Sequence, residues 1–394
     1  MVLEPVDPNA RFHERRANAR RRHKLRRTAF LLALVISAIL GGLAVWVTAL
    51  GPGSRVSEAA KRSTTETRAL AQQNPLFPKE IRGIHVTMTL ASLKGKLAEY
   101  ASLKNEGLNT IALDIKDENG AVAFSPSEAP LASEIGAAGN FYYPASVAKQ
   151  LHAEGIYLIG RVAVFEDPVL STRRPEMAIQ HSDGSTWLDY RGLGWSNEYN
   201  KKVWEYNVSI AKAAAKAGFD EIQFDYVRFP SDGPVESAVW PGKANESEST
   251  TVAHFLSYAT SQLKPLGVRV SADVFGLAAT NELGIGQSPK QIARAVDAIS
   301  PMVYPSHFGA GQYGLADPQA VPGTTVAYAL SDFKTAMRGS DAELVPWIQD
   351  FSLGGSFTLA DIQDEVLAVR QSGARGFLLW NASGEYTSGA LRPE

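Results

Sequence analysis

The sequence predicts an α/β protein whose C-terminal three quarters form one (β/α)8 TIM barrel, preceded by a single N-terminal transmembrane helix. Three observations support this prediction. Short β-rich runs alternate eight times with helical stretches, which is typical of parallel strands in a closed ring. Glycines stand between the helical stretches and the strands that follow, where a left-handed helix cap is favoured. An uncharged apolar run follows a basic segment near the N-terminus.

The first 50 residues are expected to anchor the protein in the cytoplasmic membrane. Residues 1–27 hold nine Lys and Arg against three Asp and Glu, and residues 28–50 are uncharged and rich in Leu, Ala, Val and Ile. At about 1.5 Å per residue, a helix of that length spans the hydrocarbon layer. Basic flanks stay in the cytoplasm, so we expect the tail inside the cell and the main body outside it.

A cleaved signal peptide is the alternative for this segment, and Val47-Thr48-Ala49 would supply its small-residue cleavage site. The apolar run is longer than the about 7–15 residues of a signal core, which favours the anchor. Cleavage would instead leave the body secreted. Residues 51–79 are prominent in Gly, Ser, Thr and Gln and are expected to be a linker. Residues 80–394 then form the folded domain.

The expected barrel strands are eight β-rich runs, at 83–88, 110–116, 157–165, 221–229, 268–275, 298–304, 344–350 and 376–381. Helical patterns lie between them, among others at 92–105, 144–154, 202–216, 251–264 and 359–371. Short helix-to-strand turns are marked by Gly107, Gly155, Gly218, Gly267 and Gly373. The strand-to-helix connections are long, as at the active-site end of a barrel. An open doubly wound sheet is the alternative, but no Gly-rich phosphate loop follows the first strand, and no cofactor is expected.

Alternation along the strands predicts which side chains face the lumen. The polar ones from the first five strands are His85, Asp114, Lys116, Arg161, Gln223, Asp225, Ser271 and Asp273. Burying a charge is costly unless the charge is paired, so these residues indicate a functional site near the C-terminal strand ends. A structural salt-bridge network among the three Asp, Lys116 and Arg161 is the alternative.

Asp225 and Asp273 are the expected catalytic pair. They lie on neighbouring strands roughly 4.8 Å apart, so their carboxyl groups can stand about 5–6 Å from each other, close to the separation in retaining glycosidases. We expect Asp225 to be the nucleophile, kept ionised by Arg161 or Arg228. Asp273 would be the acid/base, with its pKa raised by burial and by its neighbour's charge, although the two roles can be exchanged. Asp350, at the end of the seventh strand, is a third catalytic candidate.

Other polar and aromatic residues near the strand ends are expected to bind substrate. They are His85, Asp114, Lys116, Asp117, Arg161, Glu166, Arg228, Tyr304, His307, Trp347 and Trp380. Flat apolar rings beside carboxylates suit sugar rings, which have an apolar face and a polar edge. Trp187, Trp195 and Trp240 in the long loops fit the same interpretation. Core packing is the alternative for the tryptophans.

Several motifs resemble a bacterial family of glycoside hydrolases. They are Gly83–Thr87, Leu113–Asp117, Gly160–Phe165, Gln223–Pro230, Ile299–His307 and Pro346–Phe351. The family is classed as a domain of unknown function with a TIM barrel and is related to the amylase-like barrels. The resemblance covers about residues 82–381 and implies a carbohydrate-active barrel with Asp225 as nucleophile. Amylase-like enzymes commonly place a Glu on the fifth strand, where this sequence has Asp273.

Composition narrows the remaining classes of function. The chain has no cysteine, which excludes disulfides, thiolate zinc sites and cysteine nucleophiles. Beyond residue 27 the acidic residues outnumber the basic ones, which argues against a nucleic-acid partner. No Gly-x-Ser-x-Gly elbow is present, and the histidines lack metal-ligand spacing, so no metal is expected. The sequence therefore predicts hydrolysis of an extracytoplasmic polysaccharide or oligosaccharide. A non-catalytic wall-polysaccharide binder and a metal-dependent hydrolase or deacetylase remain alternatives.

Overall fold

Parallel strands form a closed ring in the computed structural model, which describes residues 76–281 and 283–393. The strands are β1 (Ile81–Val86), β2 (Thr110–Lys116), β3 (Tyr157–Ala163), β4 (Glu221–Asp225), β5 (Arg269–Phe275), β6 (Ala298–Met302), β7 (Glu343–Leu344), β8 (Trp347–Gln349) and β9 (Gly376–Trp380). Their order is β5-β4-β3-β2-β1-β9-β8-β6-β7, and pairing of β5 with β6 closes the ring.

Two of these segments, β7 and β8, together occupy one strand position of the barrel. Both pair with β6, and the ladder is interrupted at Pro346, which has no backbone N–H to donate. The Val345 N–H still donates to the Ile299 carbonyl at 3.0 Å. The barrel therefore has eight parallel strand positions, and the predicted (β/α)8 architecture is confirmed.

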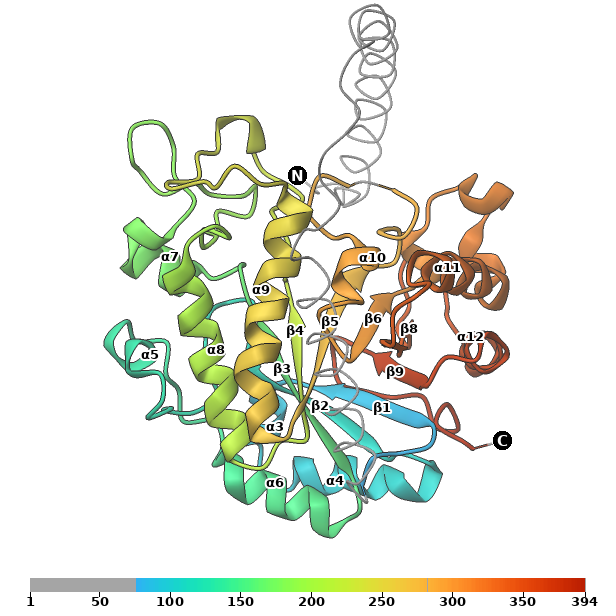
Figure 1. Ribbon diagram of the computed structural model, residues 1–394. Coiled ribbons are helices and arrows are strands. Elements are labelled where there is room, and N and C mark those ends of the chain that lie inside the picture. The colour runs from blue at the N-terminus through green and yellow to red at the C-terminus, as the bar shows by residue number, and fades with distance from the viewer. Residues whose placement is uncertain (1–75, 282, 394) are drawn as a thin grey trace, which may run out of the picture. The chain divides into compact units, whose positions relative to one another are not determined.

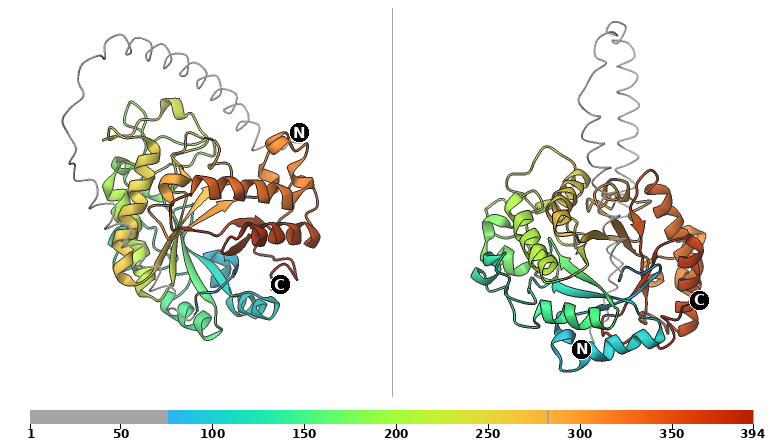
Figure 2. Two further views of the ribbon diagram at one scale, coloured as in Figure 1. Left: turned by 45° about the vertical axis from the view of Figure 1, so that its right-hand side comes forward. Right: turned by 60° about the horizontal axis from the view of Figure 1, so that its bottom comes forward.

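Helices surround the ring of strands (Figures 1 and 2). They are α3 (Met88–Ser92), α4 (Lys96–Ser102), α5 (Pro130–Glu134), α6 (Pro144–Ala153), α7 (Pro168–Arg173), α8 (Lys201–Lys216), α9 (Glu248–Leu263), α10 (Pro289–Ile292), α11 (Pro322–Ala336) and α12 (Leu359–Ser372). Helices α8 and α9 pack side by side outside β3 to β5, and α11 and α12 pack together beside β8 and β9. Short 3-10 turns complete the connections.

The expected tail, the expected anchor and most of the linker lie outside the described residues. Within 76–281 and 283–393, the structure contains no helix long and apolar enough to cross a bilayer.

Several elements differ from the sequence prediction. Strand β4 ends at Asp225 because Tyr226 adopts a left-handed conformation with φ 48°, which a strand cannot continue through. The helix expected over 92–105 is divided at Gly95, whose φ is 84°. Helix α11 was not among the helices expected from the sequence. The predicted glycine caps are confirmed, as at Gly107 and Gly155 with φ of 114° and 76°.

The lumen is packed with apolar side chains below the polar strand ends. Ile81, Ala112, Ile159 and Leu378 belong to this core. At the N-terminal end of the barrel, Phe77 lies against Tyr157 with ring centroids 5.4 Å apart. The guanidinium groups of Arg269 and Arg375 lie 4.6 and 4.9 Å from the Phe77 ring centre. The segment before β1 therefore contacts both the core and the cations at this end.

Candidate active site

Charged side chains from the first five strands meet in the lumen, as the alternation predicts. His85, Asp114, Arg161, Asp225 and Asp273 come from β1 to β5 in order, and each is 7% exposed or less. The strands are in matching register, with Asp114 beside Arg161 and with Asp225 one position past the Phe224–Ala272 pair. The parallel barrel thus gathers five ionisable groups in one layer near the C-terminal strand ends.

Arg161 is the centre of this layer. Its Nε and Nη2 donate to Asp225 Oδ2 at 2.9 and 2.6 Å, and its Nη1 donates to Asp114 Oδ1 at 2.8 Å. Burial acts to raise the pKa of Asp114, but the neighbouring His85 and Arg161 outweigh burial and hold that pKa below its ordinary value. The buried guanidinium therefore keeps two carboxylates from different strands in fixed positions.

His85, on the other neighbouring strand, contacts the same oxygen of Asp114 as Arg161 does. Its Nε2 lies 2.8 Å from Asp114 Oδ1, and its ring stacks on Trp380 with centroids 4.3 Å apart and planes inclined by 15°. Trp380 also lies 5.5 Å from the Arg161 guanidinium carbon. A half-buried indole face thus lies beside the charged layer.

Asp273 follows Asp225 around the ring and has a different environment. Its Oδ1 accepts a hydrogen bond from Trp347 Nε1 at 2.8 Å. Burial raises the pKa of Asp273 well above its ordinary value, and the charge of Asp225 raises it further. Burial also raises the pKa of the Tyr304 phenol, and the neighbouring Asp273 and Asp225 raise it further. The environments of the two carboxyl groups therefore differ, and that of Asp273 favours the protonated form.

The backbone N–H of Tyr226 contacts the second oxygen of Asp225. It donates to Asp225 Oδ1 at 2.6 Å, and Tyr226 itself has a φ of 48°. A left-handed conformation is uncommon for a bulky residue and is found preferentially at functional sites. Both carboxylate oxygens of Asp225 therefore accept hydrogen bonds. Oδ2 accepts them from Arg161, and Oδ1 accepts one from the Tyr226 backbone.

Glu166 and Arg228 belong to the loops around this layer. Glu166 is fully buried, and Arg191 Nη2 donates to its Oε1 at 2.5 Å. Burial raises the pKa of Glu166 to about 7 despite Arg191 and Arg228 nearby. The Arg228 guanidinium packs 4.8 Å from the Trp195 ring centre and donates to the Phe229 carbonyl. Of the two arginines suggested for Asp225, the structure places Arg161 on it.

Lys116 does not face the lumen, contrary to the prediction from alternation. The register between β2 and β3 shifts between Asp114 and Lys116, so Lys116 pairs with the helix-facing Val162. Its buried ammonium group donates to the Ala163 carbonyl at 2.6 Å and lies 2.9 Å from Asp167 Oδ2. This irregularity turns the lysine out of the barrel.

Asp117 and Asp350 also lie apart from the charged layer. Asp117 Oδ1 accepts from the Ala121 N–H at 2.9 Å and holds its own turn together. Both oxygens of Asp350 accept hydrogen bonds from Thr387, at 2.6 and 2.9 Å. The expectation that Asp350 joins the catalytic pair is therefore not matched by its contacts, because its carboxylate secures a C-terminal loop.

The aromatic candidates divide between exposed and buried positions. Tyr304 and Trp347 are buried in the lumen core, whereas His307 is exposed and packs 5.3 Å from the Tyr304 ring. Trp187 and Trp195 are fully buried, so core packing explains these two loop tryptophans.

One residue of the charged layer was missed from the sequence. Glu118 Oε2 lies 3.4 Å from Arg161 Nη2, although only Asp117 was singled out in that loop. The side chain of Glu118 is 37% exposed, far more than those of the other carboxylates on Arg161. Its position directly after a strand end was the available signal. Among residues 76–281 and 283–393, no group of three or more His, Asp or Glu side chains is placed to hold a metal.

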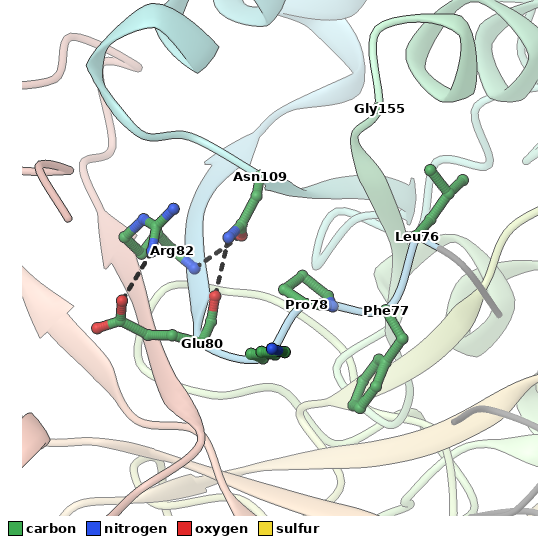
Figure 3. Close-up of a pocket in the computed structure, with 8 residues that line it drawn as sticks. Leu76, Phe77, Pro78, Glu80, Arg82, Asn109 and Gly155 are labelled. Carbon is green, nitrogen blue, oxygen red and sulfur yellow. Dashed lines mark hydrogen bonds and ion pairs between the residues drawn. The ribbon is translucent and has the colours of Figure 1, made fainter. Parts of the chain in front are cut away.

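A surface hollow of about 600 Å³ lies at the opposite end of the barrel (Figure 3). Its lining residues lie before or at the start of the strands β1 to β3 and include Phe77, Glu80, Arg82, Asn109 and Gly155. Hydrogen bonds among Glu80, Arg82 and Asn109 cross its wall. The hollow therefore lies away from the charged layer.

Solved structures with a similar fold were found at low sequence identity. The glycoside hydrolase domain of PgaB (BpsB) from Bordetella bronchiseptica is 13% identical, with a TM-score of 0.56, and the match covers 77% of this chain and 95% of that one. The chitobiase of Flavobacterium johnsoniae is 12% identical, with a TM-score of 0.51 and coverage of 79% and 47%. These likenesses support the barrel fold.

A protein from Ruminiclostridium thermocellum, described as hypothetical, is 39% identical over 48% of this chain and 97% of its own, with a TM-score of 0.44. No curated protein matches the chain. The family described as "Putative glycosyl hydrolase domain" matches residues 83–386, which include every strand end of the charged layer. The chain therefore belongs to this family of glycosyl hydrolase domains.

Proposed function

We propose that the barrel hydrolyses glycosidic bonds of a polysaccharide or oligosaccharide with retention of configuration, and that Asp225 is the nucleophile. The observation that carries this proposal is the contrast between two adjacent carboxyl groups. Asp225 accepts two hydrogen bonds from the Arg161 guanidinium, whereas burial and the charge of Asp225 raise the pKa of Asp273. Two carboxyl groups whose environments separate their protonation states are typical of glycosidases.

The contacts of Asp225 suit nucleophilic attack. The Arg161 guanidinium donates to Asp225 Oδ2, and the Tyr226 N–H restricts rotation of the carboxylate. Asp273 beside it has a raised pKa, chiefly through burial. A positioned carboxylate can then form a covalent bond to the anomeric carbon, as in retaining enzymes.

The aromatic residues near the pair support a carbohydrate substrate. Trp380 is half-buried beside Arg161, and Trp347 meets it edge to face with centroids 5.6 Å apart. An indole face next to charged hydrogen-bonding groups matches the apolar face and polar edge of a sugar. We infer that Trp380 forms one wall of the sugar-binding site.

We also propose that the enzyme acts outside the cytoplasmic membrane, held by the segment at residues 28–50. The support is the sequence alone, which places a basic cluster before an uncharged run. The substrate would then be an envelope or environmental polysaccharide. A cell-fractionation experiment, with protease added to intact cells, tests this placement, because protection of the barrel from protease would contradict it.

The test of the catalytic proposal is a polysaccharide-digestion screen of the wild-type protein and Asp225→Asn. We expect wild-type turnover to exceed that of the variant by on the order of a thousandfold or more, equivalent to about 4 kcal/mol of transition-state stabilisation. Asp332→Asn is the matched control, because Asp332 lies on α11, where it accepts a hydrogen bond from Tyr313. Circular dichroism and thermal denaturation check the fold of both variants.

The possible outcomes separate the rival functions. Equal turnover by Asp225→Asn on a confirmed substrate would refute the mechanism. Retention of a glycan without product would favour a non-catalytic binder. Loss of activity with a chelator, restored by a divalent metal, would favour a metal-dependent hydrolase.

A further inference from the structure

The proposed reaction requires an acid/base group with properties that Asp273 lacks. In a retaining glycosidase this group must reach the glycosidic oxygen in the first step and a water molecule in the second. Asp273 is 1% exposed, and its Oδ1 is bound to the Trp347 indole. Its position beside the nucleophile therefore does not present the Asp273 carboxyl group to the solvent.

Glu118 has the accessibility that the role requires. It lies in the turn after β2, and its side chain is 37% exposed, compared with 10% for Asp225 and 4% for Asp114. Its Oε2 lies 3.4 and 3.5 Å from Arg161 Nη2 and Nη1, so the contact is long. A weakly held and partly exposed carboxyl group can rotate to meet substrate and water.

The separation from the nucleophile can be bounded from two distances. Arg161 Nη2 lies 2.6 Å from Asp225 Oδ2 and 3.4 Å from Glu118 Oε2. Because both oxygens contact the same nitrogen, they are at most about 6 Å apart, whereas carboxyl groups of retaining enzymes are about 5–5.5 Å apart and those of inverting enzymes about 6.5–9.5 Å. This upper bound is shorter than the separation in inverting enzymes and is compatible with that in retaining enzymes.

We propose that Glu118 is the acid/base of the retaining reaction, an inference that rests on the proposed nucleophilic role of Asp225. In the first step an Asp225 oxygen bonds to the anomeric carbon while the glycosidic C–O bond breaks, and the Glu118 proton passes to the leaving oxygen. In the second step Glu118 takes a proton from water, the water oxygen bonds to the anomeric carbon, and the Asp225 ester bond breaks. Both carboxyl groups end as they began.

The experiment compares Glu118→Gln with the wild-type protein on two aryl glycosides of the sugar released in the digestion screen. The phenyl glycoside needs a proton on its leaving oxygen, whereas the 2,4-dinitrophenyl glycoside does not. We expect kcat/KM for the phenyl glycoside to fall at least about a hundredfold, the usual contribution of general acid catalysis, and kcat/KM for the dinitrophenyl glycoside to change much less. For the latter, kcat should fall, because the second step loses its base.

Azide provides the decisive readout. It attacks the anomeric carbon without needing a base, so it should restore kcat of Glu118→Gln on the dinitrophenyl glycoside and give a glycosyl azide of retained configuration. Glu134→Gln is the matched control, since Glu134 forms an exposed ion pair with Arg174 at 3.2 Å. That control should behave like the wild-type protein with and without azide.

Failure of this inference is distinguishable from failure of the proposed function. If Asp225→Asn is inactive but Glu118→Gln loses activity equally on both glycosides and azide has no effect, the role of Glu118 is refuted and the nucleophile stands. Leaving-group dependence and azide rescue in Asp273→Asn instead would move the role to Asp273. Full activity of Asp225→Asn would refute both proposals together.

Discussion

Replacing Glu166 with Gln should remove a large part of the pH dependence of folding stability. Glu166 is fully buried in the loop that follows β3, where burial raises the pKa of its carboxyl group from 4.5 to about 7 against the opposing charge of Arg191. In the unfolded chain the same group titrates near its ordinary pKa. The folded protein therefore binds the Glu166 proton more tightly than the unfolded protein does.

The direction in which stability changes with pH follows from this difference in proton binding. A group with a raised folded-state pKa contributes its full stability below the unfolded pKa and loses it as the pH rises through the folded pKa. For Glu166 this window extends from about pH 4.5 to just above pH 7. At about 1.36 kcal/mol per pH unit, the wild-type protein should lose about 3 kcal/mol of unfolding free energy across it through this one group.

The assay is urea denaturation of both proteins at constant ionic strength, from pH 4 to pH 8 in steps of about one pH unit. Gln has no proton to lose, so the variant's unfolding free energy minus that of the wild type should increase by about 3 kcal/mol between the ends of this range. The contributions of groups that titrate in both proteins cancel in this difference. A difference that stays constant with pH would show that folding does not raise the pKa of Glu166 and would refute the reasoning.

Two further expectations concern the ring of strands and its turns. Arg161→Met should lower the free energy of unfolding by about 3–5 kcal/mol, because buried carboxylates lose their cation. Adding Asp225→Asn to that variant should recover part of this loss in urea denaturation. A purely additive loss would contradict the pairing of Arg161 with Asp225. Gly107→Ala should destabilise the protein more than Gly155→Ala, because an added Cβ at Gly107 would lie 2.1 Å from the Leu391 carbonyl oxygen while Gly155 faces open space. Gly155→Ala should cost only the about 1–2 kcal/mol of a left-handed backbone, and equal losses in thermal denaturation would contradict the role assigned to close approach.

The strand pattern was sufficient to predict the barrel and most of its charged layer. Side chains alternate strictly along a strand, so Asp114, Arg161, Asp225 and Asp273 could be assigned to one lumen before their contacts were known. The rule fails at Lys116 because it assumes an unbroken register, and a local irregularity between β2 and β3 reverses the side chain. Such irregularities leave no mark in the alternation itself.

Contacts made by loops could not be predicted from the sequence. Glu118 contacts Arg161, which lies 43 positions further along the chain, and Asp350 binds Thr387, which lies 37 positions further along. Both depend on how a connection folds back over the strand ends, which no local periodicity encodes. The raised pKa of Asp273 was predicted from burial and a charged neighbour. Its hydrogen bond from Trp347, in contrast, depends on the packing of two strands that are not adjacent in the ring.

The position of Phe77 has a practical consequence for any shortened version of this protein. The family match begins at residue 83, yet the aromatic ring that covers Arg269 and Arg375 belongs to the six residues before that point. An expression fragment trimmed to the family boundary would lose this ring and the first residues of β1, exposing the end of the lumen core to water. A soluble fragment intended for enzymology should therefore start upstream of Leu76.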